Sequence, residues 1–142
     1  MKNRIQEQQR PMPRIKLITF DLDDTFWDIK SVIMSAEKNS REWIGSRVNH
    51  EIDWRTFEEF MSNRRELIKH DPRLRYDLGL LRKQTIHHHL KNHINNKDEL
   101  AQIIKEAYTF FLGERHKVTF FSEVVETLEA LSKNYVLGVL TN

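Results

Sequence analysis

The segment Ile15–Thr25 reads IKLITFDLDDT and decides the fold class of the chain. It opens with a mostly apolar run, Ile15–Phe20, whose length and β-forming residues favour a short buried strand. A second run of this kind, Tyr135–Leu140, reads YVLGVL near the other end of the sequence. Near-continuous apolar strands are typical of a parallel sheet covered on both faces. The sequence therefore predicts an α/β fold with parallel strands.

The residues between these strands show helical periodicity. Apolar positions recur at helical spacing over 31–48, after Asp53, from Asp71 to about His93 with a break near Gly79, and after Asn96. The predicted N-caps are Asp53, Asp71 before a proline, Asn96 with Glu99, and Ser122.

The last predicted helix covers 122–133 and ends at Asn134, which we expect in the left-handed stop position. A helix that leads directly into a strand is the second half of a right-handed β-α-β unit. We therefore expect a polar tail at 1–14, a partial Rossmann-like core at 15–30 and 115–142, and an inserted all-helical cap at 31–114.

Composition narrows the classes of function. The 142 residues are 39% hydrophobic and 31% charged, which suits a globular protein. No apolar run approaches the roughly 18 residues that span a bilayer, and the first residues have no signal-peptide core. The absence of cysteine excludes disulfides and thiolate catalysis. A net charge of +2 is not the basic stripe of a nucleic-acid binder. We expect a cytoplasmic protein with neither nucleic-acid nor membrane partners, and the sequence does not indicate its oligomeric state.

Three aspartates follow the first predicted strand. In an open α/β sheet, ligands bind beyond the carboxyl ends of the strands, where Asp21 and Asp23 lie. Residues two apart in extended chain point the same way, so both carboxylates can face one crevice. Two adjacent carboxylates raise one pKa or recruit a cation, and hard oxygen ligands suit Mg²⁺.

The carboxylates of Asp21 and Asp23 can take different roles in phosphoryl transfer. One carboxylate can attack phosphorus and form a covalent intermediate, and the other can protonate the leaving group and then activate water. Thr141 and Asn142 follow the second strand and are suitable donors to a phosphoryl group. The structural alternative is that Asp-Asp-Thr only turns the chain and caps the next segment.

With these residues placed, Ile15–Thr25 resembles motif I of the haloacid dehalogenase superfamily, hhhhDxDx[TV]. Val136–Asn142, VLGVLTN, resembles motif II, hhhhh[ST]N. The helical segment between them is similar to that of subfamily I members with a helical C1 cap, and Val124–Leu131 resembles the helix before motif II.

This resemblance implies roles for individual residues. Asp21 would be the nucleophile and a Mg²⁺ ligand, and Asp23 the general acid/base that lends its backbone carbonyl to the metal. Thr141 would bind the phosphoryl group through its hydroxyl, and Asn142 would orient it. The motif III lysine and motif IV acids normally lie well downstream of motif II. We therefore expect a truncated fragment that does not hydrolyse p-nitrophenyl phosphate alone.

The resemblance also points to a substrate class. An acid at position 23 favours a phosphatase, because true dehalogenases attack carbon, use no Mg²⁺ and lack an acid there. The run Asp23–Asp28 resembles the branch that includes bacterial FMN and phosphoribitylamino-pyrimidine phosphatases. The expected substrate is a small phosphorylated metabolite, hydrolysed through an aspartyl-phosphate. Two alternatives remain: a phosphomutase of the same superfamily, and a non-enzymatic helical interaction module whose stability ignores Mg²⁺ and phosphate analogues.

Several other side chains have two interpretations. His87–His89 with His93 suggests a metal site, because His89 and His93 share a helix face, but a run on an exposed helix explains it better. Trp27 either closes over the substrate or packs the flap, the segment that follows the first strand, against the cap. Arg82 and Arg115 are candidates to meet an anionic substrate, yet nothing in the sequence singles them out.

Overall fold

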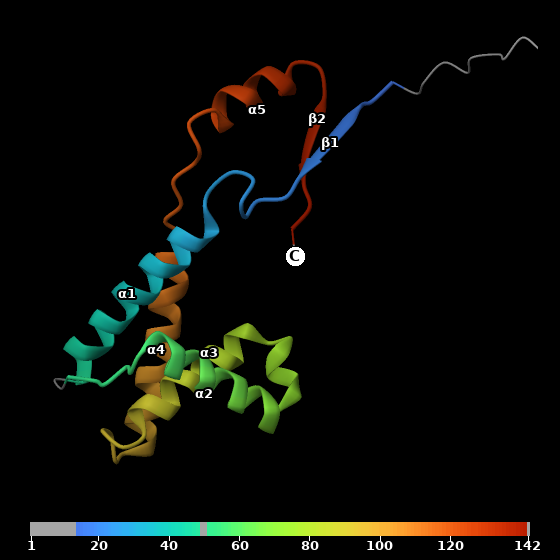
Figure 1. Cartoon of the computed structure of the whole chain (residues 1–142). Helices are drawn as coiled ribbons and strands as arrows, with labels where there is room; N and C mark the ends of the chain where they lie inside the picture. The colour runs from blue at the N-terminus through green and yellow to red at the C-terminus, as the bar shows by residue number, and fades with distance from the viewer. Residues whose placement is uncertain (1–13, 49–50, 142) are drawn as a thin grey trace, which may run out of the picture. The chain divides into compact units, whose positions relative to one another are not determined.

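The computed structural model describes residues 14–48 and 51–141, and Phe57 by its backbone only. Except for Arg14, the expected polar tail lies outside the described residues, as does Asn142. The described chain divides into two compact units (Figure 1). One, here called the strand unit, combines 14–28 with 119–141, and the other, the helical unit, is Ile29–Val118.

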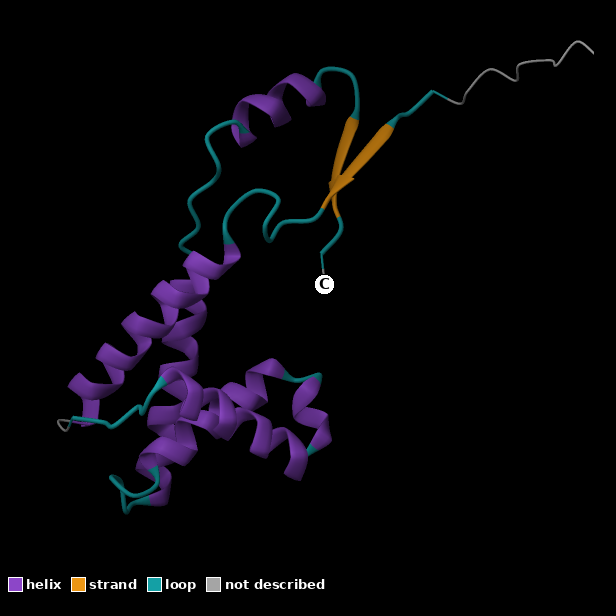
Figure 2. Ribbon diagram, viewed as in Figure 1, coloured by secondary structure: helices purple, strands orange, loops and turns teal. Residues whose placement is uncertain are grey.

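The strand unit contains two parallel strands, β1 (Leu17–Phe20) and β2 (Val136–Val139) (Figure 2). Phe20 lies opposite Val139, and the N–H of Leu140 donates to the Phe20 carbonyl at 2.8 Å, which continues the pairing beyond the strands. Helix α5 (Val124–Ser132) leads into β2. These elements confirm the predicted α/β fold with parallel strands.

Both strands are more exposed than the sequence predicts. Leu17 is 56% exposed, Val136 66% and Val139 57%. Among the described elements, α5 is the only helix that contacts either strand, and it contacts β2. The expectation of strands buried on both faces is therefore wrong for the described residues, because one short helix cannot cover a sheet.

The helical unit contains α1 (Ile29–Val48), α2 (Phe57–His70), the short 3₁₀ helix η1 (Pro72–Arg75), α3 (Leu78–Leu90) and α4 (Lys97–Arg115). Helix α4 packs against α1 and α3, and α3 also packs against α2. Eight of the buried apolar side chains form one cluster: Ile44, Ile52, Ile86, Leu90, Ile94, Leu100, Ile103 and Ala107. Each fully buried Leu or Ile contributes about 1.5–3 kcal/mol, so this cluster is the main source of the unit's stability. None of the described helices is long and apolar enough to span a membrane.

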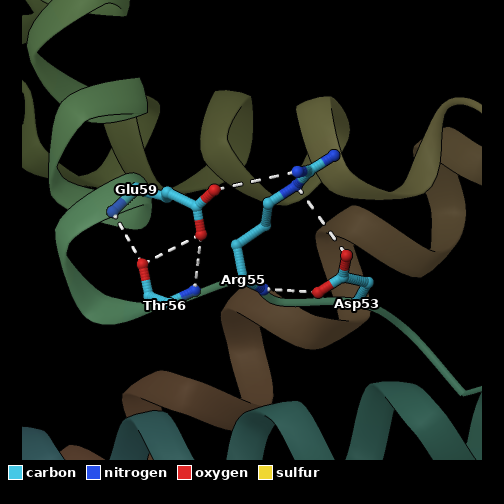
Figure 3. Close-up of polar contacts among 4 residues, drawn as sticks. All are labelled: Asp53, Arg55, Thr56 and Glu59. Atoms are coloured by element: carbon cyan, nitrogen blue, oxygen red, sulfur yellow. Dashed lines mark hydrogen bonds and ion pairs between the residues drawn. The ribbon is translucent and has the colours of Figure 1, made fainter.

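Helix α2 begins later than predicted. Its N-cap is Thr56, which accepts from the Glu59 N–H at 3.3 Å, while the Glu59 carboxylate accepts from the Thr56 N–H at 3.0 Å (Figure 3). Asp53 instead accepts from the Arg55 N–H at 2.8 Å, and Arg55 has a left-handed φ of 60°. The prediction that Asp53 caps this helix is wrong, because a left-handed residue cannot lie inside it.

Asp71 caps a helical segment as predicted, but this segment is only η1. The break that follows lies at Asp77, whose side chain accepts from the Leu80 N–H at 2.8 Å and starts α3, which agrees with the predicted break near Gly79. Asn96 caps α4 as predicted, accepting from two backbone N–H groups.

The predicted limits of the last helix are wrong at both ends. Helix α5 begins after Glu123, without a side-chain cap from Ser122. Asn134 is not left-handed, since the only non-glycine residues with positive φ in the described chain are Asp24 and Arg55.

Candidate active site

The candidate site lies at the carboxyl ends of β1 and β2. Asp21 follows β1 directly and is exposed. The strands are parallel and paired as far as Phe20 and Val139, with one further hydrogen bond from the Leu140 N–H to the Phe20 carbonyl, so Asp21 and Thr141 both follow the paired ends. Neighbouring strands are about 4.8 Å apart, so Asp21 and Thr141 lie at the same edge of the sheet. Asn142 lies outside the described residues.

The remaining acids lie in a tight turn rather than in a helix. The Leu22 carbonyl accepts from the N–H groups of Thr25, at 3.2 Å, and Phe26, at 2.9 Å. The Asp24 N–H donates to the Trp27 carbonyl at 2.9 Å. Asp24 has φ of 59°, a left-handed conformation that aspartate tolerates better than most residues. This turn keeps Asp23 next to the strand end, two residues after Asp21.

Trp27 contacts one of the candidate catalytic acids. Its indole Nε1–H donates to Asp23 Oδ1 at 3.1 Å. The indole also stacks on Phe120, with ring centroids 5.9 Å apart and an interplanar angle of 23°. The sequence predicted neither contact. Phe120 is far from the turn in sequence, and no local pattern points to it.

Two of the described side chains are candidate ligands for a magnesium ion. Asp21 and Asp23 offer hard oxygen ligands at an open strand end, which suits a cation that keeps several of its waters. No group of three or more His, Asp or Glu side chains that could hold a metal occurs in the described part of the chain. The fit to Mg²⁺ therefore rests on two carboxylates, and other ligands must come from water, substrate or further groups.

Arg82 takes part in a structural ion pair. Its guanidinium pairs with Glu37, lies over the Phe111 ring at 3.4 Å from the centroid and is mostly buried. Glu37 also pairs with Arg41 at 2.9 Å. Burial alone would raise the pKa of Glu37, but attraction and hydrogen bonds from Arg82 and Arg41 outweigh it and lower this pKa. Arg115, the last residue of α4, is exposed.

The histidine run does not form a metal site. Helix α3 ends at Leu90, so His93 lies beyond it, and the expected helix face shared with His89 is wrong. His89 is not exposed either: it is buried against Phe60 and Trp54, with ring centroids 6.1 and 5.1 Å away. Burial, followed by the charges of His88 and Arg41, lowers the pKa of His89. His89 is therefore a core histidine.

Comparison with known proteins found no matching family model. The chain is 26% identical over 135 residues to the 5-amino-6-(5-phospho-D-ribitylamino)uracil phosphatase YigB of Escherichia coli strain K12, covering 94% of this chain and 56% of that protein. Its fold is similar to the crystal structure of a 2-haloacid dehalogenase from Pseudomonas syringae pv. tomato DC3000, with a TM-score of 0.71 and 36% identity over 90% of this chain and 55% of that one.

The chain thus spans about half the length of each of these relatives. The two relatives carry different activities in their names, yet both match nearly the whole of this chain. The match in fold agrees with the match in sequence. The matches in sequence and in fold together support a place for this chain in the haloacid dehalogenase-like hydrolase superfamily.

Proposed function

We propose that this chain belongs to a Mg²⁺-dependent phosphohydrolase that acts on a small phosphorylated metabolite through an aspartyl-phosphate. The main support is the parallel pairing of β1 with β2, which sets Asp21 and Thr141 at one edge of the sheet. The helical unit, Ile29–Val118, corresponds in this proposal to the cap.

In the proposed reaction, Asp21 attacks phosphorus because its carboxylate is exposed at the strand end. Asp23 protonates the leaving oxygen and then takes a proton from the attacking water, since a positioned carboxyl can serve as acid and base in turn. The Thr141 hydroxyl donates to the phosphoryl oxygens, and Asn142 is proposed to orient them. Mg²⁺, when bound, supplies positive charge that offsets the charge of the phosphoryl oxygens.

The proposed substrate class follows from two observations. The E. coli relative is named for a phosphorylated ribitylamino-pyrimidine, and it matches 94% of this chain. The Pseudomonas relative is named as a dehalogenase. Asp23 favours the phosphatase, because displacement of halide from carbon needs no acid to protonate a leaving alkoxide. We therefore propose that the substrate is a small phosphate monoester, of the kind for which the E. coli relative is named.

Metal binding can be tested on the chain itself. Mn²⁺ prefers the same oxygen ligands as Mg²⁺ and broadens nearby nuclear magnetic resonance (NMR) signals. We expect Mn²⁺ to broaden the amide signals of residues 21–25 and 141, excess Mg²⁺ to reverse this, and Asp21→Asn to prevent it. Asp53→Asn is the matched control, since Asp53 lies in the helical unit. Broadening that Asp21→Asn leaves unchanged would contradict the proposal and favour the interaction module.

Catalysis can be tested in a chimera that joins this chain to the part of the E. coli protein that it does not match. The expected result is Mg²⁺-dependent release of p-nitrophenol from p-nitrophenyl phosphate. Asp21→Asn should lower this rate by roughly a thousandfold or more, because it removes the nucleophile. A folded chimera whose hydrolysis survives Asp21→Asn would refute the assigned role of Asp21.

A further inference from the structure

The turn after β1 is built so that one aromatic side chain reaches back to Asp23. The Asp24 N–H donates to the Trp27 carbonyl at 2.9 Å, and Asp23 and Trp27 form an isolated β-bridge. The left-handed φ of Asp24, 59°, makes this short reversal possible. Within it, the Trp27 indole Nε1–H lies 3.1 Å from Asp23 Oδ1.

The indole is itself held by neighbouring rings. It stacks on Phe120 at 5.9 Å and meets Phe26 edge-on at 6.3 Å. Phe26 is buried, and its carbonyl accepts from the Phe121 N–H at 2.9 Å, which ties the segment carrying Phe120 to the turn. Aromatic pairs of this geometry attract each other beyond the effect of burial, so the two rings restrict the orientation of the indole.

We propose that Trp27 is a positioning residue that orients the Asp23 carboxyl through this hydrogen bond. An indole N–H can only donate, so it holds Oδ1 as an acceptor whichever group Oδ2 contacts. A general acid/base must lie within hydrogen-bond reach of the proton that it transfers, and a fixed carboxyl meets this need. The catalytic role of this orientation rests on the proposed function, whereas the orientation of Asp23 by Trp27 does not.

The first test reads the Asp23 side chain by NMR. Trp27→Phe keeps a ring for the stack on Phe120 but removes the N–H donor. We expect the Hα–Hβ couplings of Asp23 to change from those of a single χ1 rotamer to averaged values. Trp43→Phe is the matched control, because Trp43 stacks on Phe110 within the helical unit. Equal couplings in the wild type and in Trp27→Phe would overturn the proposal.

The second test reads the hydrogen bond from the Trp27 side, so that the inference does not depend on one variant. Asp23→Ala removes the acceptor, and the Trp27 indole proton should move upfield and exchange with solvent roughly tenfold faster, as expected for loss of a hydrogen bond to a charged group. Asp23→Asn, which retains an oxygen, should restore most of the protection. No change in exchange in Asp23→Ala would also overturn the proposal.

These readouts separate the inference from the proposed function. If Mn²⁺ fails to broaden the signals of residues 21–25 while Trp27→Phe frees the Asp23 rotamer, the metal-dependent function fails and the positioning stands. If Mn²⁺ binds and the Asp23 rotamer is the same in Trp27→Phe as in the wild type, the positioning role of Trp27 is refuted and the proposed function stands.

Discussion

The helical unit, Ile29–Val118, buries a continuous apolar core, whereas the strand unit buries very little. Phe26 and Val124 are its only buried apolar side chains among the described residues. The strand unit carries the paired aspartates and Thr141, and the helical unit carries the buried ion pair and the core histidine. The chemistry proposed here and the stability of the chain thus depend on different residues.

The difference has a physical reason. Groups that meet a ligand must stay accessible, so Asp21 and Thr141 are exposed at strand ends. Groups that stabilise a helical bundle must lose contact with water, so Leu90 is fully buried. Substitutions in the helical unit should therefore mainly change the free energy of unfolding, and the following four variants test this expectation.

The largest effect is expected from Leu90→Ala. Leu90 is 0% exposed within the apolar cluster, so its truncation leaves a cavity and should lower the free energy of unfolding by about 3 kcal/mol. Urea denaturation followed by circular dichroism measures this. Leu78→Ala is the control: Leu78 is 66% exposed and should cost less than about 0.5 kcal/mol. Equal costs at the two positions would remove the distinction between core and surface in this unit.

Glu37→Gln should cost about 2 kcal/mol, because it leaves the mostly buried Arg82 without a charged partner. Glu42→Gln on the same helix is the matched control, since its pair with Lys38 has side chains 66% and 75% exposed and contributes little.

The same pair predicts a pH dependence of stability. The pKa of Glu37 is lowered by folding from its ordinary 4.5, so its contribution is complete above that value and is lost as the pH falls below it. Equal acid sensitivity of the wild type and Glu37→Gln would contradict this assignment.

His89 predicts a second, smaller pH dependence. Its pKa is lowered by folding from 6.5, chiefly through burial, so the unfolded chain takes up the proton first as the pH falls. The free energy of unfolding should decline as the pH drops below 6.5, by at most about 1.4 kcal/mol per pH unit because one proton is involved. His89→Gln should flatten this slope, and the exposed His87→Gln should not. Identical slopes for the two variants would contradict the prediction.

The smallest effect is expected from Thr56→Ala, at about 1 kcal/mol. This change removes the side chain that accepts from the Glu59 N–H at the start of α2. Thr56→Ser keeps the hydroxyl and should retain most of the stability. If Asp53→Ala costs more than Thr56→Ala, Asp53 rather than Thr56 limits the start of this helix.

Local signals predicted much of the fold. The run at Ile15–Phe20 and the run at Tyr135–Leu140 both contain strands, because apolar β-forming residues express a local preference. The Asn96 cap was also predictable, since a cap is a contact between close neighbours in sequence. The Asp53 prediction failed because two capping residues compete within four positions, and only the backbone conformation of Arg55 decides between them.

The sequence by itself predicted the two strands, the placement of Asp21 and Asp23 after the first of them, and the resemblance to a family, because these features are set by neighbours along the chain. Only the tertiary structure decided that Trp27 contacts Asp23 and Phe120, that Arg82 pairs with Glu37, and that His89 is buried. The stack on Phe120 and the pair with Glu37 each join residues far apart in sequence, and the burial of His89 needs aromatic rings from other segments. No local propensity encodes such contacts: they follow from how the elements pack.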